Sequence, residues 1–428
     1  MESSEIHNQQ SHKTNIDFIH YGCSLIGLTL LPLAGTAAQI GMGLILLGLA
    51  RIPTTFQSIK TLSRSPIVML ILAWWIIAYM SLAWSIDSKT SLLASPISIL
   101  IIPALMPFLS KSKSYIYALA IGGGIHAVIQ ILIWFGTVKD VAYRPFNMNG
   151  GLHWYSPYTG LWAATILLLV LGLVANTGSW KNRTPLIIIA LALTVSIVIS
   201  GSRVLFLFIP LSLLVVLIRL ITLPNVAVSR RVLAAIFISI TVVSAGAVLI
   251  PDTFVNKRVK SLLLDQAKMT KDQNNNYETS LGLRYLWWKG GYKIWKRSPW
   301  IGHGGGSIME QFALQETMMP SEFGANVTDF ITPDPHSSFL ATFIEQGILG
   351  ASCMISFVLV SLISAWRKAV SDPATVGLVA AWSILVAIGL FHTIHLSAYA
   401  IPLVSVLTVL SIHSAPPFLN QVKNKYHA

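Results

Sequence analysis

The chain has 428 residues, of which 54% are hydrophobic and only 11% are charged, and its formal net charge is +13. Soluble domains carry roughly 25% charged residues, so this composition excludes an ordinary soluble protein and predicts a polytopic membrane protein. The positive charge does not indicate a nucleic-acid partner, because in a membrane protein the placement of the basic residues decides their meaning.

Residues 1–17 are polar, and the apolar run after them lacks the pattern of a cleavable signal peptide. About 20 apolar residues span a bilayer as a helix, and we predict about twelve spans. The first two are short and closely joined, which predicts a hairpin. The predicted spans are 18–34, 36–50, 66–85, 91–109, 115–136, 157–176, 184–200, 203–223, 232–250, 337–365, 374–393 and 397–414.

Basic residues favour one side of these predicted spans. Cytoplasmic connections collect Lys and Arg, so this side is predicted to be the cytoplasm, with the tails 1–17 and 415–428 both on it. The residues that carry the argument are Arg51, Lys60, Arg64, Lys111, Lys113, Lys181, Arg183, Arg219, Arg230, Arg231, Arg367, Lys368, Lys423 and Lys425.

The longest connection, residues 251–335, lies on the outer side and separates nine predicted spans (18–250) from three more (336–414). Its basic residues do not contradict this topology, because long loops are translocated regardless of charge. Within it, LRYLWWKGGYKIWKRSPW has aromatic and basic residues at helical spacing. This pattern predicts an amphipathic helix that lies on the membrane surface or packs on the helical bundle.

His336 stands where the polar loop gives way to an apolar helix, in the stretch ITPDPHSSFL. Ser337 and Ser338 are good helix-capping residues, so the histidine could simply begin a helix. A helix N-terminus also disfavours a charged imidazolium, however, and a neutral imidazole can accept a proton as a general base.

Three arginines fall on the same outer side as His336. Arg203 follows a short polar turn between two apolar spans, Arg284 precedes an aromatic cluster, and Arg144 lies in another outer loop. Guanidinium groups bind phosphate in a bidentate fork, so these side chains suit a diphosphate headgroup. The alternatives are contacts with lipid phosphates or plain solvation.

The remaining motifs give weaker evidence of function. GHGGGS at 302–307 could cradle phosphate but lacks the Lys-Ser/Thr of a nucleotide loop, which favours a turn. His392 and His395 end an apolar span and are predicted to be packing or interfacial residues. Cys23 and Cys353 lie in apolar segments, so no disulfide is expected, and no metal-ligand spacing appears.

At this point the pattern resembles the lipopolysaccharide O-antigen ligase family, within the O-antigen ligase and polymerase superfamily. His336-Ser337, nine residues, Gly347, two residues and Gly350 match the ligase signature. The long outer loop before the last three spans, Arg203 in SGSR, Arg284 in GLRYLWW and the stretch RSPWIGHGGG are also similar to the family.

The resemblance implies an all-α, GT-C-like glycosyltransferase of the bacterial inner membrane whose active site faces the periplasm. It would move an O-antigen chain from undecaprenyl pyrophosphate to the lipid A-core acceptor without metal or cofactor and with inversion. His336 would be the base, and Arg203, Arg284 and Arg144 would bind the diphosphate. An O-antigen polymerase and a protein O-oligosaccharyltransferase remain alternatives, as does an anionic-lipid transporter of a different class.

Overall fold

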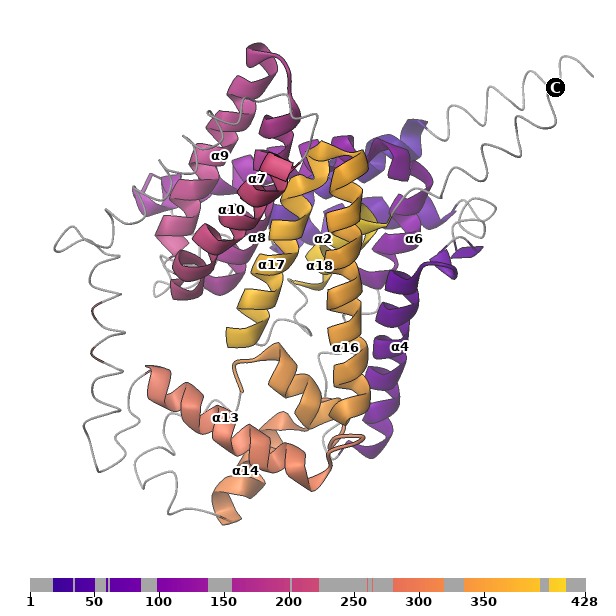
Figure 1. The fold of residues 1–428 in the computed structure, drawn as a ribbon, viewed down its shortest axis with the longest axis vertical. Coiled ribbons are helices and arrows are strands. Elements are labelled where there is room, and N and C mark those ends of the chain that lie inside the picture. Colours follow the sequence, from indigo (N-terminus) through magenta and orange to yellow (C-terminus); the bar gives the residue numbers. More distant parts are fainter. Residues whose placement is uncertain are drawn as a thin grey trace, which may run out of the picture.

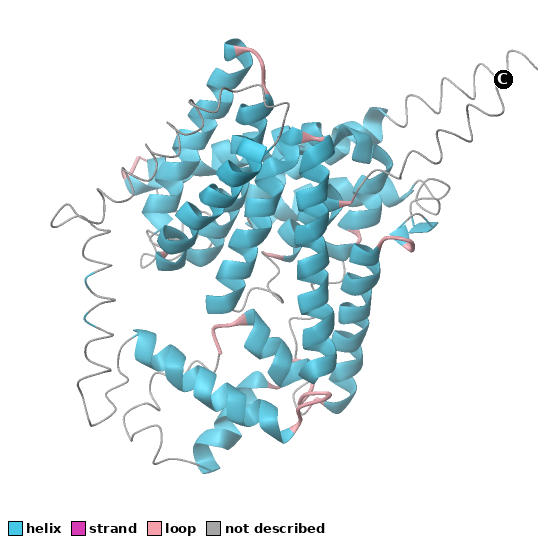
Figure 2. Ribbon diagram, viewed as in Figure 1, coloured by secondary structure: helices cyan, strands magenta, loops and turns pink. Residues whose placement is uncertain are grey.

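The structure is a computed structural model that describes residues 18–33, 35–50, 59–60, 62–85, 98–137, 156–200, 202–222, 260, 264, 280–318, 335–392 and 400–412. Within these ranges all regular structure is helical (Figures 1 and 2). The helices are Phe18–Leu33, α2 (Gly35–Leu46), α4 (Pro66–Ser81), α6 (Ile101–Leu105), α7 (Ser112–Trp134), α8 (Ser156–Asn176), α9 (Trp180–Ser200), α10 (Arg203–Thr222), α13 (Ser280–Arg297), α14 (Ile308–Met318), α16 (Ser338–Ser371), α17 (Val376–Phe391) and α18 (Ile401–Ser411).

Five helical segments in the described ranges are long and apolar enough to cross a bilayer: Pro66–Trp84, Ile101–Trp134, Tyr158–Asn176, Trp180–Ser200 and Ser338–Val370. Shorter apolar helices lie beside them. Several helices expose apolar side chains along one face, as α9 does with Ile188, Leu191, Val195 and Val198. An exposed apolar face of this kind is suited to lipid, and the chain is therefore a polytopic membrane protein. The number of twelve spans stays a prediction, and the predicted span 232–250 lies outside the described residues.

The predicted hairpin near the N-terminus is confirmed by the packing of helix Phe18–Leu33 against α2. A Cβ atom added to Gly27 would lie 2.5 Å from the carbonyl oxygen of Gly41, so the two backbones touch. The run Ile101–Trp134 also folds back on itself, because the Tyr115 hydroxyl donates to the Leu105 carbonyl at 2.9 Å. In a straight helix these residues would be roughly 15 Å apart along the axis.

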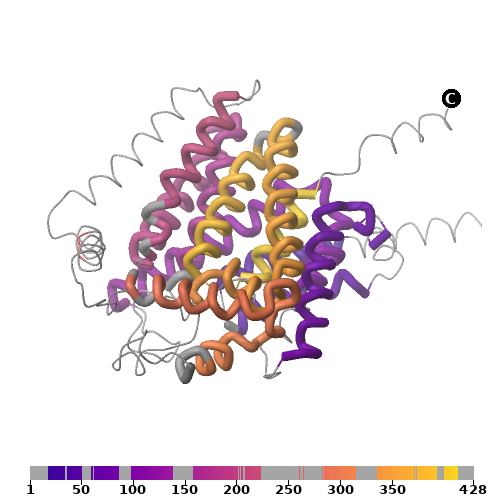
Figure 3. Tube along the Cα trace, turned by 60° about the horizontal axis from the view of Figure 1, so that its bottom comes forward, coloured from indigo at the N-terminus to yellow at the C-terminus, as the bar shows by residue number. Residues whose placement is uncertain are grey.

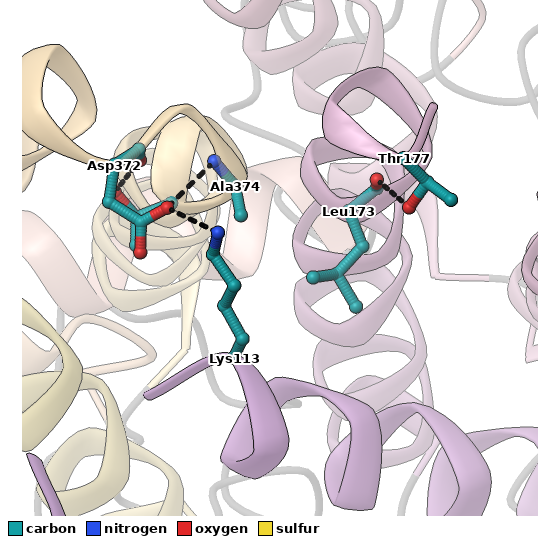
Figure 4. A network of polar contacts seen from close by, with 6 residues as sticks. Lys113, Leu173, Thr177, Asp372 and Ala374 are labelled. Carbon is teal, nitrogen blue, oxygen red and sulfur yellow. Dashed lines mark hydrogen bonds and ion pairs between the residues drawn. The ribbon is translucent and has the colours of Figure 1, made fainter. Parts of the chain in front are cut away.

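The bundle has a basic end, which Figure 4 shows in part. Lys113 at the start of α7 pairs with Asp372 just after α16 at 3.5 Å. Arg219 near the end of α10 donates to the Trp366 carbonyl at 3.0 Å. Lys111 lies over the Tyr21 ring at 4.3 Å. Helix Phe18–Leu33 therefore begins at the end where α16 finishes, and the compartment that this end faces stays a prediction.

Helices α13 and α14 lie across the opposite end of the bundle (Figures 1 and 3). The inner face of α13 packs on the first turns of α16 and on α14. A small apolar cluster holds these three helices together, and it consists of Trp287, Ile294, Ile308, Phe312, Ala341 and Ile344. The described contacts of this helix therefore support packing on the bundle. An orientation on the membrane surface stays a prediction.

Candidate active site

His336 lies at the end of the bundle that carries α13 and is half-buried. Its φ is 47°, and among the described residues it alone has a positive φ without being glycine. Such a backbone conformation is costly for a residue with a side chain and is concentrated at functional sites. Ser337 follows as the N-cap of α16, and its hydroxyl accepts from the Leu340 N–H at 3.4 Å. The backbone therefore changes direction at His336, immediately before the helix begins.

Two aromatic residues of α13 fix the surroundings of this histidine. The ring of Trp287 meets the His336 ring edge to face, with 4.4 Å between centroids. The next residue, Trp288, donates its indole N–H to the Pro335 carbonyl at 3.1 Å. Because α13 is itself packed on α16, these contacts hold the imidazole in one place relative to both helices.

A second imidazole faces His336 from the end of α17. The ring of His392 lies 5.9 Å from that of His336, and His392 is only 8% exposed. Its backbone carbonyl accepts from the Ser338 hydroxyl at 3.0 Å, so α17 is tied to the first turn of α16. The sequence predicted His392 to be a packing or interfacial residue, which agrees with its burial, and the structure in addition brings it beside the candidate base. His395 lies outside the described residues.

The sequence predicts a span over 337–365, and the apolar helical segment Ser338–Val370 covers it, but α16 is broken at Gly347, which the sequence analysis does not predict. The φ and ψ of Gly347 are 64° and −162°, a region that is essentially restricted to glycine. The part of α16 before Gly347 consequently lies at an angle to the long part that runs along the bundle (Figure 1). The break keeps the start of α16, and with it His336, at the end of the bundle.

The break in α16 frees backbone groups, and the turn between α13 and α14 pairs with them. Ile348 N–H donates to the Pro299 carbonyl at 2.8 Å, and Leu349 N–H donates to that of Trp300 at 3.2 Å. In return, the carbonyls of Ile344 and Glu345 accept from the N–H groups of His303 and Gly304 at 2.8 and 2.9 Å. This exchange satisfies the backbone groups that the kink takes out of the helix.

The same turn explains the glycine-rich stretch at 302–307. Gly306 N–H donates to the Glu345 carboxylate at 2.9 Å, and the Gly305 carbonyl accepts from the Ser85 hydroxyl at 2.7 Å. The amides of residues 303, 304 and 306 are therefore already used within the protein. The alternative of a phosphate-cradling loop does not fit, whereas the predicted turn is confirmed.

Arg284 is one helical turn before Trp287 and Trp288, about 5 Å along the axis of α13, and its side chain is half-buried. Arg203 is the first residue of α10 and follows a tight turn in which Ser202 N–H donates to the Ser200 hydroxyl at 3.4 Å. Its own side chain is outside the described residues. The start of α10 approaches the site end, since Phe208 packs against Phe391 with ring centroids 5.9 Å apart. Arg144 lies outside the described residues.

An apolar cavity of about 70 Å³ opens beside the start of α16, and the sequence analysis does not predict it. Helices α4, α16, α17 and α18 line it, and its walls include Trp74, Ser338, Phe357, Trp382 and Leu385. It extends from the polar residue Ser338 into the interior of the bundle. A hydrocarbon chain would suit such walls, because they offer almost no polar groups.

No three His, Cys, Asp or Glu side chains of the described residues form a group that could hold a metal ion, and metal independence stays a prediction. Sequence reasoning also missed the roles of Trp287 and Glu345. A signal was present for His392, since it ends an apolar span on the outer side. Only the packing of α17 on α16 shows which histidine it meets.

Comparison with known protein families shows that part of the chain matches one of them. Residues 187–355 match the family model described as O-antigen ligase. No curated protein matches the chain. Proteins of the matched family are O-antigen ligases and polymerases, which transfer glycosyl chains. The matched range includes Arg203, Arg284 and His336, together with the kink at Gly347. The chain therefore carries an O-antigen ligase family domain, which spans residues 187–355.

Proposed function

We propose that the protein is an O-antigen ligase. It transfers the O-antigen chain from undecaprenyl pyrophosphate to the lipid A-core oligosaccharide at the periplasmic face of the bacterial inner membrane, with both termini in the cytoplasm. The observation that carries the proposal is the position of His336, inside the matched O-antigen ligase domain. There the imidazole is held between Trp287 and His392 at one end of a membrane bundle.

In the proposed reaction, a hydroxyl group of the core sugar attacks the anomeric carbon of the first O-antigen sugar. His336 accepts the hydroxyl proton as the new C–O bond forms. The bond between the anomeric carbon and the diphosphate oxygen breaks, and undecaprenyl pyrophosphate leaves with the bonding electrons. Because the attack is a direct displacement, the configuration at the anomeric carbon inverts.

The departing diphosphate gains negative charge, which fixed cationic groups stabilise. We assign this role to Arg284 and Arg203, with Arg144 as a third diphosphate-binding residue. Arg284 stands on α13 one turn from the tryptophans that contact His336 and Pro335, and Arg203 begins the helix that packs against the end of α17. Arginine supplies the charge that a divalent ion supplies elsewhere, and we therefore propose a metal-independent reaction.

The two substrates are a lipid-linked glycan and a lipid-linked core. The apolar cavity that Ser338 helps to line at the start of α16 is suited to part of a hydrocarbon chain, which would leave the attached diphosphate near this part of α16. An O-antigen polymerase would use the same donor and the same base, with a second lipid-linked glycan as acceptor. A protein O-oligosaccharyltransferase would use a protein hydroxyl, and a transporter would transfer nothing.

The test is a reconstituted assay with purified protein, undecaprenyl-pyrophosphate glycan and lipid A-core, in the presence of EDTA and without ATP. Lipopolysaccharide mobility on a gel reports ligation. We expect ligation by the wild type and a loss of roughly a thousandfold in His336→Ala, in the range that removal of a general base produces.

Ser337→Ala is the matched control, because it removes the N-cap of the same helix and leaves the imidazole. We expect it to lower the free energy of unfolding by about 1 kcal/mol while ligation by the folded protein continues. Ligation at the wild-type rate by His336→Ala would exclude the base role. Lengthened glycan on the lipid carrier would identify a polymerase, glycan on a protein acceptor would identify an oligosaccharyltransferase, and no transfer would favour a transporter.

A further inference from the structure

Helix α13 presents an exposed row of aromatic side chains, Tyr285, Trp288 and Tyr292, here called the α13 aromatic stripe. Their exposed fractions are 47%, 37% and 49%. The spacing of three and four residues places them on one face of the helix. The opposite face is buried, since Trp287 and Ile294 are only 8% and 0% exposed and pack in the apolar cluster shared with α16. The rings are therefore accessible although the helix that carries them is firmly packed.

The stripe is joined directly to the proposed reaction centre. The indole of Trp288 donates to the Pro335 carbonyl, one residue before His336, and its ring lies 6.0 Å from that of Phe391. Arg284 precedes Trp288 by one turn on the same side of the helix. Because α13 lies across the end of the bundle (Figures 1 and 3), the stripe extends away from His336 along that end.

Flat aromatic rings with polar edges offer what a sugar ring requires. A pyranose has an apolar face of C–H groups, which packs on an aromatic face, and hydroxyl groups at its rim, which bind polar tips such as the Tyr hydroxyl. Lys289 and Lys296 lie beside the stripe and are exposed, and the ammonium group of Lys296 is 4.7 Å from the Tyr292 ring centroid. These cations add donors for hydroxyl or acidic groups of a glycan.

We propose that the α13 aromatic stripe is a sugar-binding subsite, which stacks on pyranose rings next to the bond that is made or broken. The inference rests on the proposed function and extends it by naming where the glycan lies. Two sources of sugar are available to the site, the O-antigen chain of the donor and the core oligosaccharide of the acceptor. Both present the same ring chemistry.

An aromatic and basic helix face can instead anchor in a lipid interface. The contacts of Trp288 favour sugar, because they lead to Pro335 and Phe391 at the reaction centre rather than to an exposed apolar helix face. The position of Trp288 is also fixed by a hydrogen bond at its polar edge, which leaves part of its ring free to stack.

The first experiment measures KM for donor and for acceptor separately, with the full chain in vesicles. We expect Tyr292→Ala to raise the KM of one of the two substrates roughly tenfold, as loss of a Tyr anchor does at binding surfaces, with kcat changed by less than about twofold. The substrate whose KM rises identifies the source of the sugar. Tyr292→Phe keeps the ring and should stay close to wild type.

Two controls separate stacking from other roles. Trp300→Ala removes an aromatic side chain that is 66% exposed at the same end of the molecule but outside the stripe, and we expect both KM values to stay unchanged. Trp288→Phe removes the hydrogen bond to Pro335 and keeps a ring. A fall in kcat at constant KM would assign Trp288 to positioning of His336, and the Tyr292 result alone would then decide on stacking.

The lipid alternative is tested by repeating the KM series in vesicles with and without phosphatidylglycerol. If Tyr292→Ala and Lys289→Ala are impaired together, and only with the anionic lipid, the stripe is a lipid anchor and the sugar proposal is overturned. Unchanged KM values for Tyr292→Ala in an active enzyme would overturn it as well.

A binding measurement separates this proposal from the proposed function. The probe is the water-soluble O-antigen polysaccharide, which mild acid releases from its lipid. The readout is saturation-transfer NMR with the protein in nanodiscs. We expect transfer to sugar C–H protons in the wild type and its loss in the double variant Tyr285→Ala, Tyr292→Ala. Sugar binding by a wild type that does not ligate would contradict the proposed function alone. Ligation by the wild type, with equal saturation transfer in the wild type and the double variant, would contradict only the proposed sugar-binding role of the stripe.

Discussion

The two ends of the helical bundle are held by different kinds of contact. At the site end, the connections are backbone hydrogen bonds and aromatic rings, such as the pairing of Ile348 with Pro299 and the contact of Trp287 with His336. At the basic end, charged side chains hold the helix ends, as Lys368 does by donating to the carbonyls of Leu410 and Ile412 at 2.6 and 3.1 Å.

The difference shows how this fold separates stability from chemistry. A cation that caps a helix end stabilises the bundle at one place, and its loss should leave the distant site intact. A kink that is held by a neighbouring turn instead sets the direction of α16 and the position of His336 together. We therefore expect substitutions at the kink of α16 to change activity and stability together, and substitutions at the basic end to change stability alone.

The largest effect in this comparison should come from Gly347→Ala. The backbone there is in a region that costs a residue with a side chain about 1–3 kcal/mol, and the new Cβ would lie 2.4 Å from the backbone of Trp300. The turn must then move away from α16. We expect a lower midpoint of thermal unfolding in detergent and at least a roughly tenfold loss of ligation, because displaced catalytic groups lose rate steeply.

Gly43→Ala is the matched control for this substitution. Gly43 lies inside α2, and nothing stands within 4 Å of an added Cβ there. Alanine is the better helix former by about 1 kcal/mol, so this variant should be as stable as the wild type or slightly more stable. Equal behaviour of the two glycine variants would refute the role of the kink.

A smaller effect, limited to stability, is expected for Lys368→Met. Lys368 is only 6% exposed, and its ammonium group binds the carbonyl of Leu410 in the last turn of α18. Hydrogen bonds to a charged group contribute roughly 1.5–3 kcal/mol. We expect a loss of about 2 kcal/mol in the free energy of unfolding, measured by heating in detergent and size-exclusion chromatography. Ligation per folded molecule should remain at the wild-type value. A fall in that value would contradict the proposal that the basic end affects stability alone.

The smallest effect should come from Lys113→Ala, which removes the ion pair with Asp372 (Figure 4). The Lys113 side chain is 53% exposed, and exposed pairs contribute about 0–1 kcal/mol. The difference from wild type should shrink further in high salt. Asp372→Ala should cost more, because Asp372 also accepts from the Ala374 N–H. The comparison is made by thermal unfolding at two ionic strengths, and an equal cost of both variants would contradict this order.

Parts of the site were predictable because they depend on neighbours in the sequence. The boundary between loop and helix at His336 is visible in the sequence as a change from polar to apolar residues, and the N-cap at Ser337 follows from its residue type. The contacts of His336 were not predictable in this way. His392 stands 56 positions later in the chain, and nothing in its own segment shows that α17 ends against the first turn of α16.

The sequence by itself determined that this is a helical membrane protein, where many of its apolar helices lie and which residues belong to an O-antigen ligase pattern. These properties depend on composition and on short-range periodicity, because the length and hydrophobicity of each segment decide whether it can span a bilayer as a helix. Only the tertiary structure decided the kink at Gly347, the pairing of the glycine-rich turn with it, the second imidazole and the apolar cavity. Each of these requires groups from distant segments to satisfy or enclose one another, and no local pattern encodes that choice.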